Sequence, residues 1–251
     1  MSTADRIERE RLAKRTLILD AARDLFVERG IEAVTLREIA QRIEYSTTAI
    51  YVQFKDKQDL VEQMVREDFG KFANALQRAA SVPDAVDRLE KLGHEYINFA
   101  LTMPRHYQLL FMTPMRKPVA PAHVDADSPD EGIAGYHLLL HTVEEIMTAG
   151  RFRAELTDAQ ALAQIIWAGV HGLVSVMIVA GHVAEFAWRP HDELTSIWFD
   201  SMMRGMLRSE RGHERVTQRT STVSSNKAKI PPTAQRTAPK HPRSSKTPKA
   251  R

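Results

Sequence analysis

Apolar residues near the start of the chain recur at helical spacing. Four of them lie three or four positions apart, as on one stripe of a short helix: Leu36, Ile39, Ala40 and Ile43. Thr35 stands immediately before this stripe and Glu38 follows three residues later, a combination that forms a capping box at a helix start. We therefore expect a short helix that begins after Thr35 and buries its apolar stripe.

A second short helix is predicted a few residues further on. Glu44 and Tyr45 form the connection, and Ser46 is a favourable N-cap. The apolar positions of this second helix are Ala49, Ile50 and Phe54. Two short helices joined by a tight turn form a helix-turn-helix.

The chain from residue 56 to 208 keeps the helical periodicity, without a strand pattern or an internal repeat. Caps, prolines and glycines divide it into helices predicted at about 56–76, 83–102, 107–111, 130–149, 158–181 and 192–208. Residues 113–128, with several prolines and an acidic run nearby, are predicted to form a mobile loop. The predicted fold class is all-α.

The outward face of the second short helix has the chemistry of a nucleic-acid contact. Its first turn holds small hydroxyl side chains, which allow close approach to a duplex and bond to phosphates or base edges. This turn is followed by longer hydrogen-bonding side chains, by an apolar side chain suited to a thymine methyl and by a cation suited to a phosphate. The predicted DNA contacts are Thr35, Ser46, Thr47, Thr48, Tyr51, Val52, Gln53 and Lys57. The alternative is that these are ordinary solvated surface residues.

This region resembles the signature of the TetR-type transcriptional regulators. That signature is a capped second helix, a recognition helix ending in Tyr-x-x-Phe, and Lys three residues beyond the Phe. Here Thr35, Tyr51, Phe54 and Lys57 occupy those positions. The resemblance extends upstream to a helix that is stopped by Gly30 and whose buried face is Ile18, Ala21, Ala22, Leu25 and Phe26.

The chain departs from many members of that family at Glu44, where they carry Gly in the turn. If residue 44 is left-handed, its side chain costs about 1–2 kcal/mol. The resemblance implies a three-helix DNA-binding domain at 1–55 and a helical effector-binding and dimerisation domain at 56–211. The remaining residues, 212–251, form a basic tail.

The segment from Trp167 to Gly172 resembles the Trp…His-Gly signature of one subgroup of TetR-type C-terminal domains. Gly169 and Gly172 each cost about 1 kcal/mol in a helix interior relative to Ala, which indicates close helix packing. In this family the last two helices pair with their copies as a four-helix bundle. The resemblance thus implies a homodimer seam through Leu173, Val176, Met177, Ala180, Trp198, Phe199, Met202, Met203 and Met206. The alternative is that these residues build only a monomer core.

The same resemblance implies a small-molecule effector cavity among the middle helices. Aromatic side chains with a few polar tips suit an apolar or aromatic ligand. The predicted lining residues are Phe69, Phe72, Tyr96, Phe99, Tyr107, Phe111, Tyr136, Met147, Trp167 and His171. Each of them also fits ordinary core packing, and His171 also fits a hydrogen-bonded core histidine.

Composition narrows the function class. The chain has no cysteine, so neither a disulfide framework nor a thiolate metal site is available. No secretion signal is recognisable, which favours a cytoplasmic protein. A phosphate loop, a GxSxG turn and a dinucleotide fingerprint are all missing from the sequence, so we expect neither an enzyme nor a bound cofactor.

Charge is concentrated at the C-terminal end. Residues 212–251 contain ten Lys and Arg against one acid, a net charge of +9, whereas the formal charge of the whole chain is +3. This segment has no aromatic residue and is rich in Pro, Ser, Thr and Lys, a composition typical of disorder. It suits nonspecific phosphate contacts, although a solvated terminus without a defined role is equally compatible.

Two further interpretations rest on single helices. His137, His141 and Glu145 are spaced four apart, as in a zinc or nickel site on one helix face, but a polar surface is the simpler reading. The apolar run 165–180 has 16 residues where a membrane span needs about 20, so a buried bundle helix is favoured over a span.

The sequence as a whole predicts a homodimeric transcriptional repressor that responds to a ligand. It is expected to bind double-stranded DNA at an inverted-repeat operator. The rival prediction is an architectural DNA-binding protein dominated by its basic tail.

Overall fold

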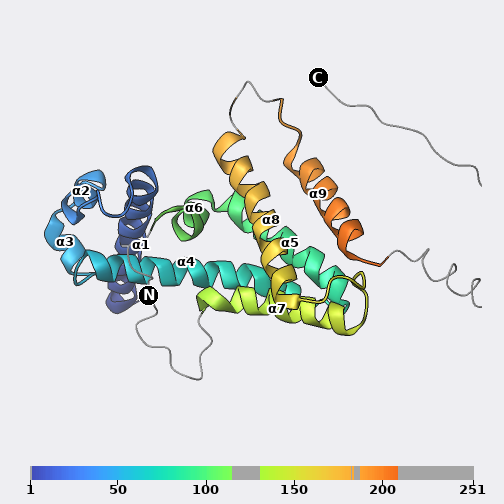
Figure 1. The fold of residues 1–251 in the computed structure, drawn as a ribbon. Helices are drawn as coiled ribbons and strands as arrows, with labels where there is room; N and C mark the ends of the chain where they lie inside the picture. Colours follow the sequence, from blue (N-terminus) through green and yellow to red (C-terminus); the bar gives the residue numbers. More distant parts are fainter. Residues whose placement is uncertain (1, 115–130, 182, 184–186, 209–251) are drawn as a thin grey trace, which may run out of the picture. The chain divides into compact units, whose positions relative to one another are not determined.

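The structure is a computed structural model and describes residues 2–114, 131–181, 183 and 187–208. This part of the chain contains nine helices (Figure 1): α1 Thr3–Arg29, α2 Leu36–Arg42, α3 Thr47–Tyr51, α4 Lys57–Ala80, α5 Ala85–Thr102, α6 Pro104–Met112, α7 Glu131–Thr148, α8 Ala159–Ala180 and α9 His191–Met206. The described residues also contain one isolated antiparallel β-bridge, between Phe152 and Leu207. The predicted all-α class is confirmed. The basic tail 212–251 and nearly all of the predicted loop lie outside the described residues.

Helices α1, α2 and α3 share a core with the first half of α4. The apolar stripe predicted for α2 is buried, and Ile50 and Phe54 from the α3 region are almost completely inaccessible. The Thr35 hydroxyl accepts the Glu38 N–H while the Glu38 carboxylate accepts the Thr35 N–H, so the predicted capping box is confirmed. Gly30 ends α1 with a φ of 82°.

Several predicted helix ends were displaced by a few residues. The cap of α8 is Asp158, whose carboxylate accepts the Ala161 N–H, so the helix begins at Ala159 rather than at residue 158. Helix α5 begins after Asp84 rather than at Pro83, because Asp84 accepts the N–H groups of the first turn. In both places an Asp carboxylate reaches the free amides of the first turn and so fixes where the helix begins.

Helix α4 is common to two cores. Its first half places Leu60 and Met64 in the core of α1–α3, and its second half places Phe72 and Leu76 in a cluster with α5, α6, α8 and α9. Twenty-four residues of α-helix extend about 36 Å. Helix α4 therefore connects the two cores along its length.

Two glycines let α9 approach its neighbours. A Cβ on Gly93 of α5 would lie 2.1 Å from the Phe199 ring, and a Cβ on Gly169 of α8 would lie 2.7 Å from the Trp198 ring. The sequence expectation that Gly169 serves close helix packing is confirmed. Gly172, by contrast, has open space around its Cβ position within the described chain.

Helix α8 is longer than the apolar run that predicted it. It spans 22 residues, with a mean hydropathy of 1.9 in its most apolar window, so its length and composition alone would permit a membrane span. The apolar run 165–180 within this helix has 16 residues, and the six helical residues before it include Gln160 and Gln164. One face of α8, including Val170, Val174 and Met177, is buried against the other helices.

Candidate nucleic-acid interface and cavity

Helix α3 is oriented by its buried residues. Because Ile50 and Phe54 point into the core, the opposite side of the helix is turned to solvent. Thr48 is exposed, Tyr51 is 56% exposed and Val52 is 77% exposed, while Thr47 and Gln53 are half-buried. An apolar side chain as exposed as Val52 is a typical feature of a contact surface.

Three of the predicted DNA contacts already form hydrogen bonds within the helix-turn-helix region. The Ser46 hydroxyl accepts the Ala49 N–H at 3.3 Å and so caps α3. The Thr35 hydroxyl is held between the Glu38 amide and carboxylate at 3.2 and 2.8 Å. The Lys57 ammonium donates to the Glu32 carbonyl at 3.4 Å. These residues position the two helices, whereas Thr48, Tyr51 and Val52 present the exposed surface.

The capping box of α2 is further fixed by an ion pair. Arg29 of α1 donates to the Glu38 carboxylate at 2.8 Å, and together with the bonds from Thr35 it lowers the pKa of Glu38 to about 2. The carboxylate stays ionised at any physiological pH. The start of α2 is thereby tied to the end of α1.

Sequence reasoning passed over two cations beside this surface. Arg37 and Arg42 lie on α2, are exposed and form no ion pair within the described part of the chain. Both lie off the apolar stripe of α2, and this position is the sequence signal that indicates an outward-facing cation. Unpaired guanidinium groups on a helix-turn-helix are suited to phosphate.

The turn between α2 and α3 has a left-handed residue at position 44, where many members of the family carry Gly. Glu44 has a φ of 59°, in the left-handed region that disfavours a side chain. The Tyr45 N–H bonds to the Ala40 carbonyl at 2.9 Å across this turn. The bond fixes the turn despite the unfavourable residue.

A cavity of about 550 Å³ opens among α4, α5, α6, α7, α8 and α9. Six predicted effector residues line it: Phe69, Phe72, Tyr96, Phe111, Tyr136 and Trp167. The other four predicted residues, Phe99, Tyr107, Met147 and His171, do not line it. The cavity is also lined by Trp198 and Phe199, which were predicted from the sequence to belong to the dimer seam.

Beside the cavity, Tyr96, Tyr107 and His171 form a hydrogen-bonded group. The two tyrosine hydroxyls are 3.1 Å apart, and those of Tyr107 and Tyr96 lie 2.5 and 3.1 Å from His171 Nδ1. Burial lowers the pKa of His171 and raises the pKa of both tyrosines, so all three are neutral. His171 is therefore hydrogen-bonded within its own chain and does not line the cavity.

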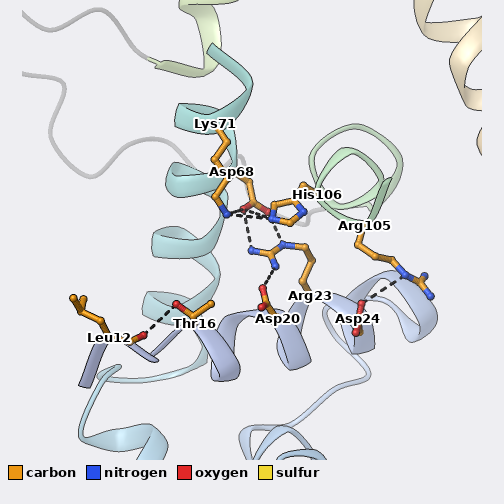
Figure 2. Close-up of polar contacts among 9 residues, drawn as sticks. All are labelled: Leu12, Thr16, Asp20, Arg23, Asp24, Asp68, Lys71, Arg105 and His106. Carbon is orange, nitrogen blue, oxygen red and sulfur yellow. Dashed lines mark hydrogen bonds and ion pairs between the residues drawn. The ribbon is translucent and has the colours of Figure 1, made fainter. Parts of the chain in front are cut away.

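A polar cluster joins α1 and α4 (Figure 2). Arg23 of α1 and Asp68 of α4 are 2% and 0% exposed, and two parallel hydrogen bonds of 2.8 and 2.9 Å connect them. Arg23 also reaches Asp20 at 2.7 Å, so the buried guanidinium has a second carboxylate partner. This bidentate pair fixes the angle between the two helices.

Helix α6 completes the same cluster (Figure 2). His106 Nε2 lies 3.7 Å from Asp68 Oδ1, and Lys71 Nζ donates to that ring nitrogen at 3.1 Å. Burial lowers the pKa of His106 to about 4, assisted by the positive charges of Arg23 and Lys71. The neutral ring accepts the lysine hydrogen bond.

A second contact between α6 and α1 lies on the surface. The Arg105 guanidinium is 3.6 Å from Asp24 and from Glu28 of α1. Helix α6 is thus held to α1 by charges, and it contributes Phe111 to the cavity wall.

The exposed side of α8 is an apolar stripe. Ile165, Val176 and Val179 are 58%, 49% and 54% exposed, and Ala168 and Gly172 lie between them at helical spacing. Of the residues predicted for a dimer seam, Val176 belongs to this stripe, while Met177 and Phe199 are buried within their own chain. Leu173, Ala180, Trp198, Met202, Met203 and Met206 are half-buried.

Two of the side chains on which the metal interpretation of α7 rests form polar contacts with each other and with α5. His141 Nδ1 is 2.9 Å from the Glu145 carboxylate, which also forms an ion pair with Arg88 of α5. No group of three metal-ligating side chains is found in the described ranges. His137 and His141 are both exposed on α7.

Comparisons with known proteins support the helix-turn-helix assignment. Residues 18–64 match the model of bacterial regulatory proteins of the tetR family, and residues 89–205 match a tetracyclin repressor-like C-terminal domain. The subgroup with the Trp…His-Gly signature is not identified by these matches and stays a prediction.

Individual relatives agree with this result. The transcriptional repressor KstR2 of Mycolicibacterium smegmatis is 31% identical over 103 residues, which cover 39% of this chain and 47% of the relative. KstR2 of Rhodococcus jostii is 28% identical over 99 residues, covering 38% of this chain and 48% of the relative. The matched segments thus span about half the length of these curated relatives.

Solved structures show the same fold over a larger part of the chain. A Rhodococcus sp. RHA1 protein of unknown function is 26% identical with a TM-score of 0.59, covering 77% of this chain and 95% of its own. The ketosteroid transcriptional regulator KstR2 of Mycobacterium tuberculosis, at 16% identity and a TM-score of 0.61, covers 78% and 96% and shows the fold alone.

The curated relatives are transcriptional repressors, in agreement with the expectation that the chain is not an enzyme. The two family matches include both the helix-turn-helix and most of the remaining described helices. The chain belongs to the TetR family of bacterial regulatory proteins.

Proposed function

We propose that this DNA-binding regulator is a homodimeric repressor that binds an inverted-repeat operator and releases it when a small molecule occupies the cavity. One observation carries the proposal: α4 and α6 both line the cavity and both hold α1. Phe69 lies on the cavity wall directly after Asp68, which binds Arg23. Phe111 lies on the wall in α6, whose His106 contacts the same carboxylate.

DNA binding follows from the exposed surface of α3. In a symmetric dimer, two recognition helices about 34–36 Å apart enter successive major grooves. Thr47, Thr48 and Gln53 are the residues proposed to read bases, and Tyr51 and Lys57 those proposed to bind phosphates. Thr35 and Ser46 support them by capping α2 and α3.

The dimer is proposed to form through the apolar stripe of α8 together with α9. Exposed apolar side chains along one helix are an unfavourable surface for a monomer. Gly172, with open space beside it, allows the backbone of a second copy to approach closely. Ile197 of α9, also exposed, adds to this surface.

Release of the operator is proposed to result from a change in the distance between the two recognition helices. A ligand that binds better to one position of α4 and α6 shifts the population toward that position. Because Arg23 and Asp68 tie α1 to α4, the separation of the two recognition helices then changes, and affinity for the operator falls.

The test is binding to DNA from beside the protein's own coding region, measured by fluorescence anisotropy and footprinting. Lys57→Ala should weaken binding to every sequence, whereas Thr47→Ala should reduce discrimination between bases by about 1–3 kcal/mol. Lys91→Ala, which removes a charge from α5, is the matched control and should change neither. Unchanged affinity in Lys57→Ala at moderate salt would remove that residue from the interface.

The second candidate, an architectural protein that binds through its basic tail, is motivated by the charge of +9 in residues 212–251. Deleting this segment should flatten the dependence of affinity on salt while the order of preferred sequences is kept. Loss of the footprint in the deletion variant would support the architectural function instead.

A further inference from the structure

The chemistry of the cavity limits what can occupy it. Its wall is formed mainly by aromatic and aliphatic side chains, and the described residues that line it include no Asp, Glu, Lys, Arg or His. A charged group moved into such a site loses its hydration without gaining a partner. Occupants with a buried carboxylate or ammonium are therefore disfavoured.

The polar atoms at two positions on the wall are already engaged. The Tyr96 hydroxyl is bonded to Tyr107 and His171, and it accepts the Trp167 indole N–H at 3.4 Å. Gln160 and Gln164, the amide side chains of the lining, are exposed to solvent. The Tyr96 hydroxyl is therefore already satisfied within the protein, and the two glutamine amides remain hydrated by solvent.

Tyr136 is different. Its hydroxyl is buried and has no hydrogen-bond partner among the described residues, although its ring lies on the cavity wall 5.9 Å from the ring of Trp167. A buried hydroxyl without a partner is unfavourable, and almost all such groups in folded proteins are satisfied. The hydroxyl is closed off in this state, so a bound molecule with one polar atom would supply the missing bond after a small movement of the ring toward the cavity.

We propose that the cavity binds a neutral, largely apolar ring compound that exchanges a single hydrogen bond with the Tyr136 hydroxyl. This inference rests on the proposed effector function and specifies its ligand class. The volume of about 550 Å³ lies in the range of cavities that enclose drug-sized ligands. Aromatic side chains on several helices provide ring faces for stacking.

Two fluorescent probes that share one skeleton test the charge requirement. N-phenyl-1-naphthylamine is neutral and has one N–H donor, whereas 8-anilino-1-naphthalenesulfonate adds a sulfonate to the same rings. The neutral probe should bind once per chain and about tenfold more tightly than the anion. Equal or tighter binding of the anion, displaced by the neutral probe, would overturn the proposal.

Tyr136→Phe tests the hydrogen bond. Loss of the hydroxyl should weaken binding of N-phenyl-1-naphthylamine by about fivefold. Without ligand, the variant should melt at the same temperature or higher, because it no longer buries an unsatisfied hydroxyl. Tyr45→Phe, which removes an exposed hydroxyl outside the cavity, should change neither measurement. Unchanged probe affinity in Tyr136→Phe, or a lower melting temperature, would refute the assigned role.

Gln164→Lys tests the charge requirement in the opposite direction. It adds a cation at an exposed position of the cavity lining, so it should raise the affinity for the sulfonate probe relative to the neutral one. No change in that ratio would place the probes elsewhere and count against the proposal.

These measurements use the full chain without DNA and are separate from the operator assay. If the neutral probe binds as stated and the operator is not released, the ligand class stands and the ligand response of the proposed function fails. If an anionic compound releases the operator and competes with the neutral probe, the ligand class fails and the response stands.

Discussion

Glu44 combines an unfavourable backbone conformation with an exposed side chain. Among the described residues it is the non-glycine position with a positive φ, 59°. It joins the two helices of the DNA-binding motif, so the strain lies in the turn that sets their relative angle. No hydrogen bond or ion pair of its carboxylate is found in the described ranges to offset this cost.

Glu44→Gly should raise the free energy of unfolding by about 0.5–1 kcal/mol, the relief of left-handed strain less the greater chain entropy of glycine. Urea unfolding followed by circular dichroism measures this difference. Glu44→Ala keeps the Cβ and removes only the charge, so it should give no comparable gain. An equal gain in both variants would assign the effect to charge instead of backbone.

Local residue-level features could be predicted from the sequence. The Thr35 capping box was found because donor and acceptor lie three residues apart. The bond from Lys57 to the Glu32 carbonyl could not be predicted, because it joins residues 25 positions apart that meet only after α1–α4 pack.

At the scale of elements, the cluster that joins α1, α4 and α6 was not predicted. Arg23 and Asp68 look like ordinary charges on helix surfaces, and their burial depends on how α1 packs on α4. Helix positions follow from periodicity, whereas a pair 45 residues apart leaves no local pattern. The helices themselves were therefore predicted more completely than the contacts between them.

Asp68→Asn should reduce the free energy of unfolding by about 3 kcal/mol, because it leaves the Arg23 guanidinium buried without a charged partner of equal strength. Replacing both residues with apolar ones, Arg23→Met with Asp68→Leu, should recover most of this loss. Arg105→Gln, on the exposed ion pairs of α6, should cost less than about 1 kcal/mol. A double variant as unstable as Asp68→Asn would show that the pair is irreplaceable for packing.

His106 should make stability depend on pH. Its folded pKa of about 4 lies below the ordinary value of 6.5, so the unfolded chain binds a proton more readily. Stability is then full above about pH 6.5 and is lost as the pH falls toward 4, by about 1–2 kcal/mol between pH 7 and 5. The groups around the ring are Asp68 and Lys71 of α4 and Arg23 and Asp20 of α1.

His106→Gln isolates this contribution from those of other titrating groups. Urea unfolding of both proteins between pH 5 and 7.5 should give a shallower slope of stability against pH for the variant. Parallel curves would mean that His106 is equally easy to protonate in the folded and unfolded chain.

At the scale of the whole molecule, the apolar helix α8 could be predicted from the sequence, whereas the side of it that stays exposed could not. Helix α8 is apolar on nearly every side, so its periodicity does not separate the face turned to its own core from the face turned outward. Val176 was predicted and is exposed, whereas Ile165 and Val179 were passed over and Met177 is buried. Packing against α5 and α7, which the sequence does not encode locally, decides the difference.

Val176→Glu should convert the proposed dimer into monomers. Symmetry places two copies of the substituted residue in one interface, so two carboxylates would be desolvated together. Sedimentation velocity measures the mass directly. Leu17→Glu, which introduces the same charge at an exposed apolar position of α1, should leave the mass unchanged. Because Val176 is half exposed in the single chain, the variant should keep its helical circular dichroism. A dimer that persists in Val176→Glu would move the interface away from the α8 stripe, and operator binding by the monomer would contradict the paired recognition helices.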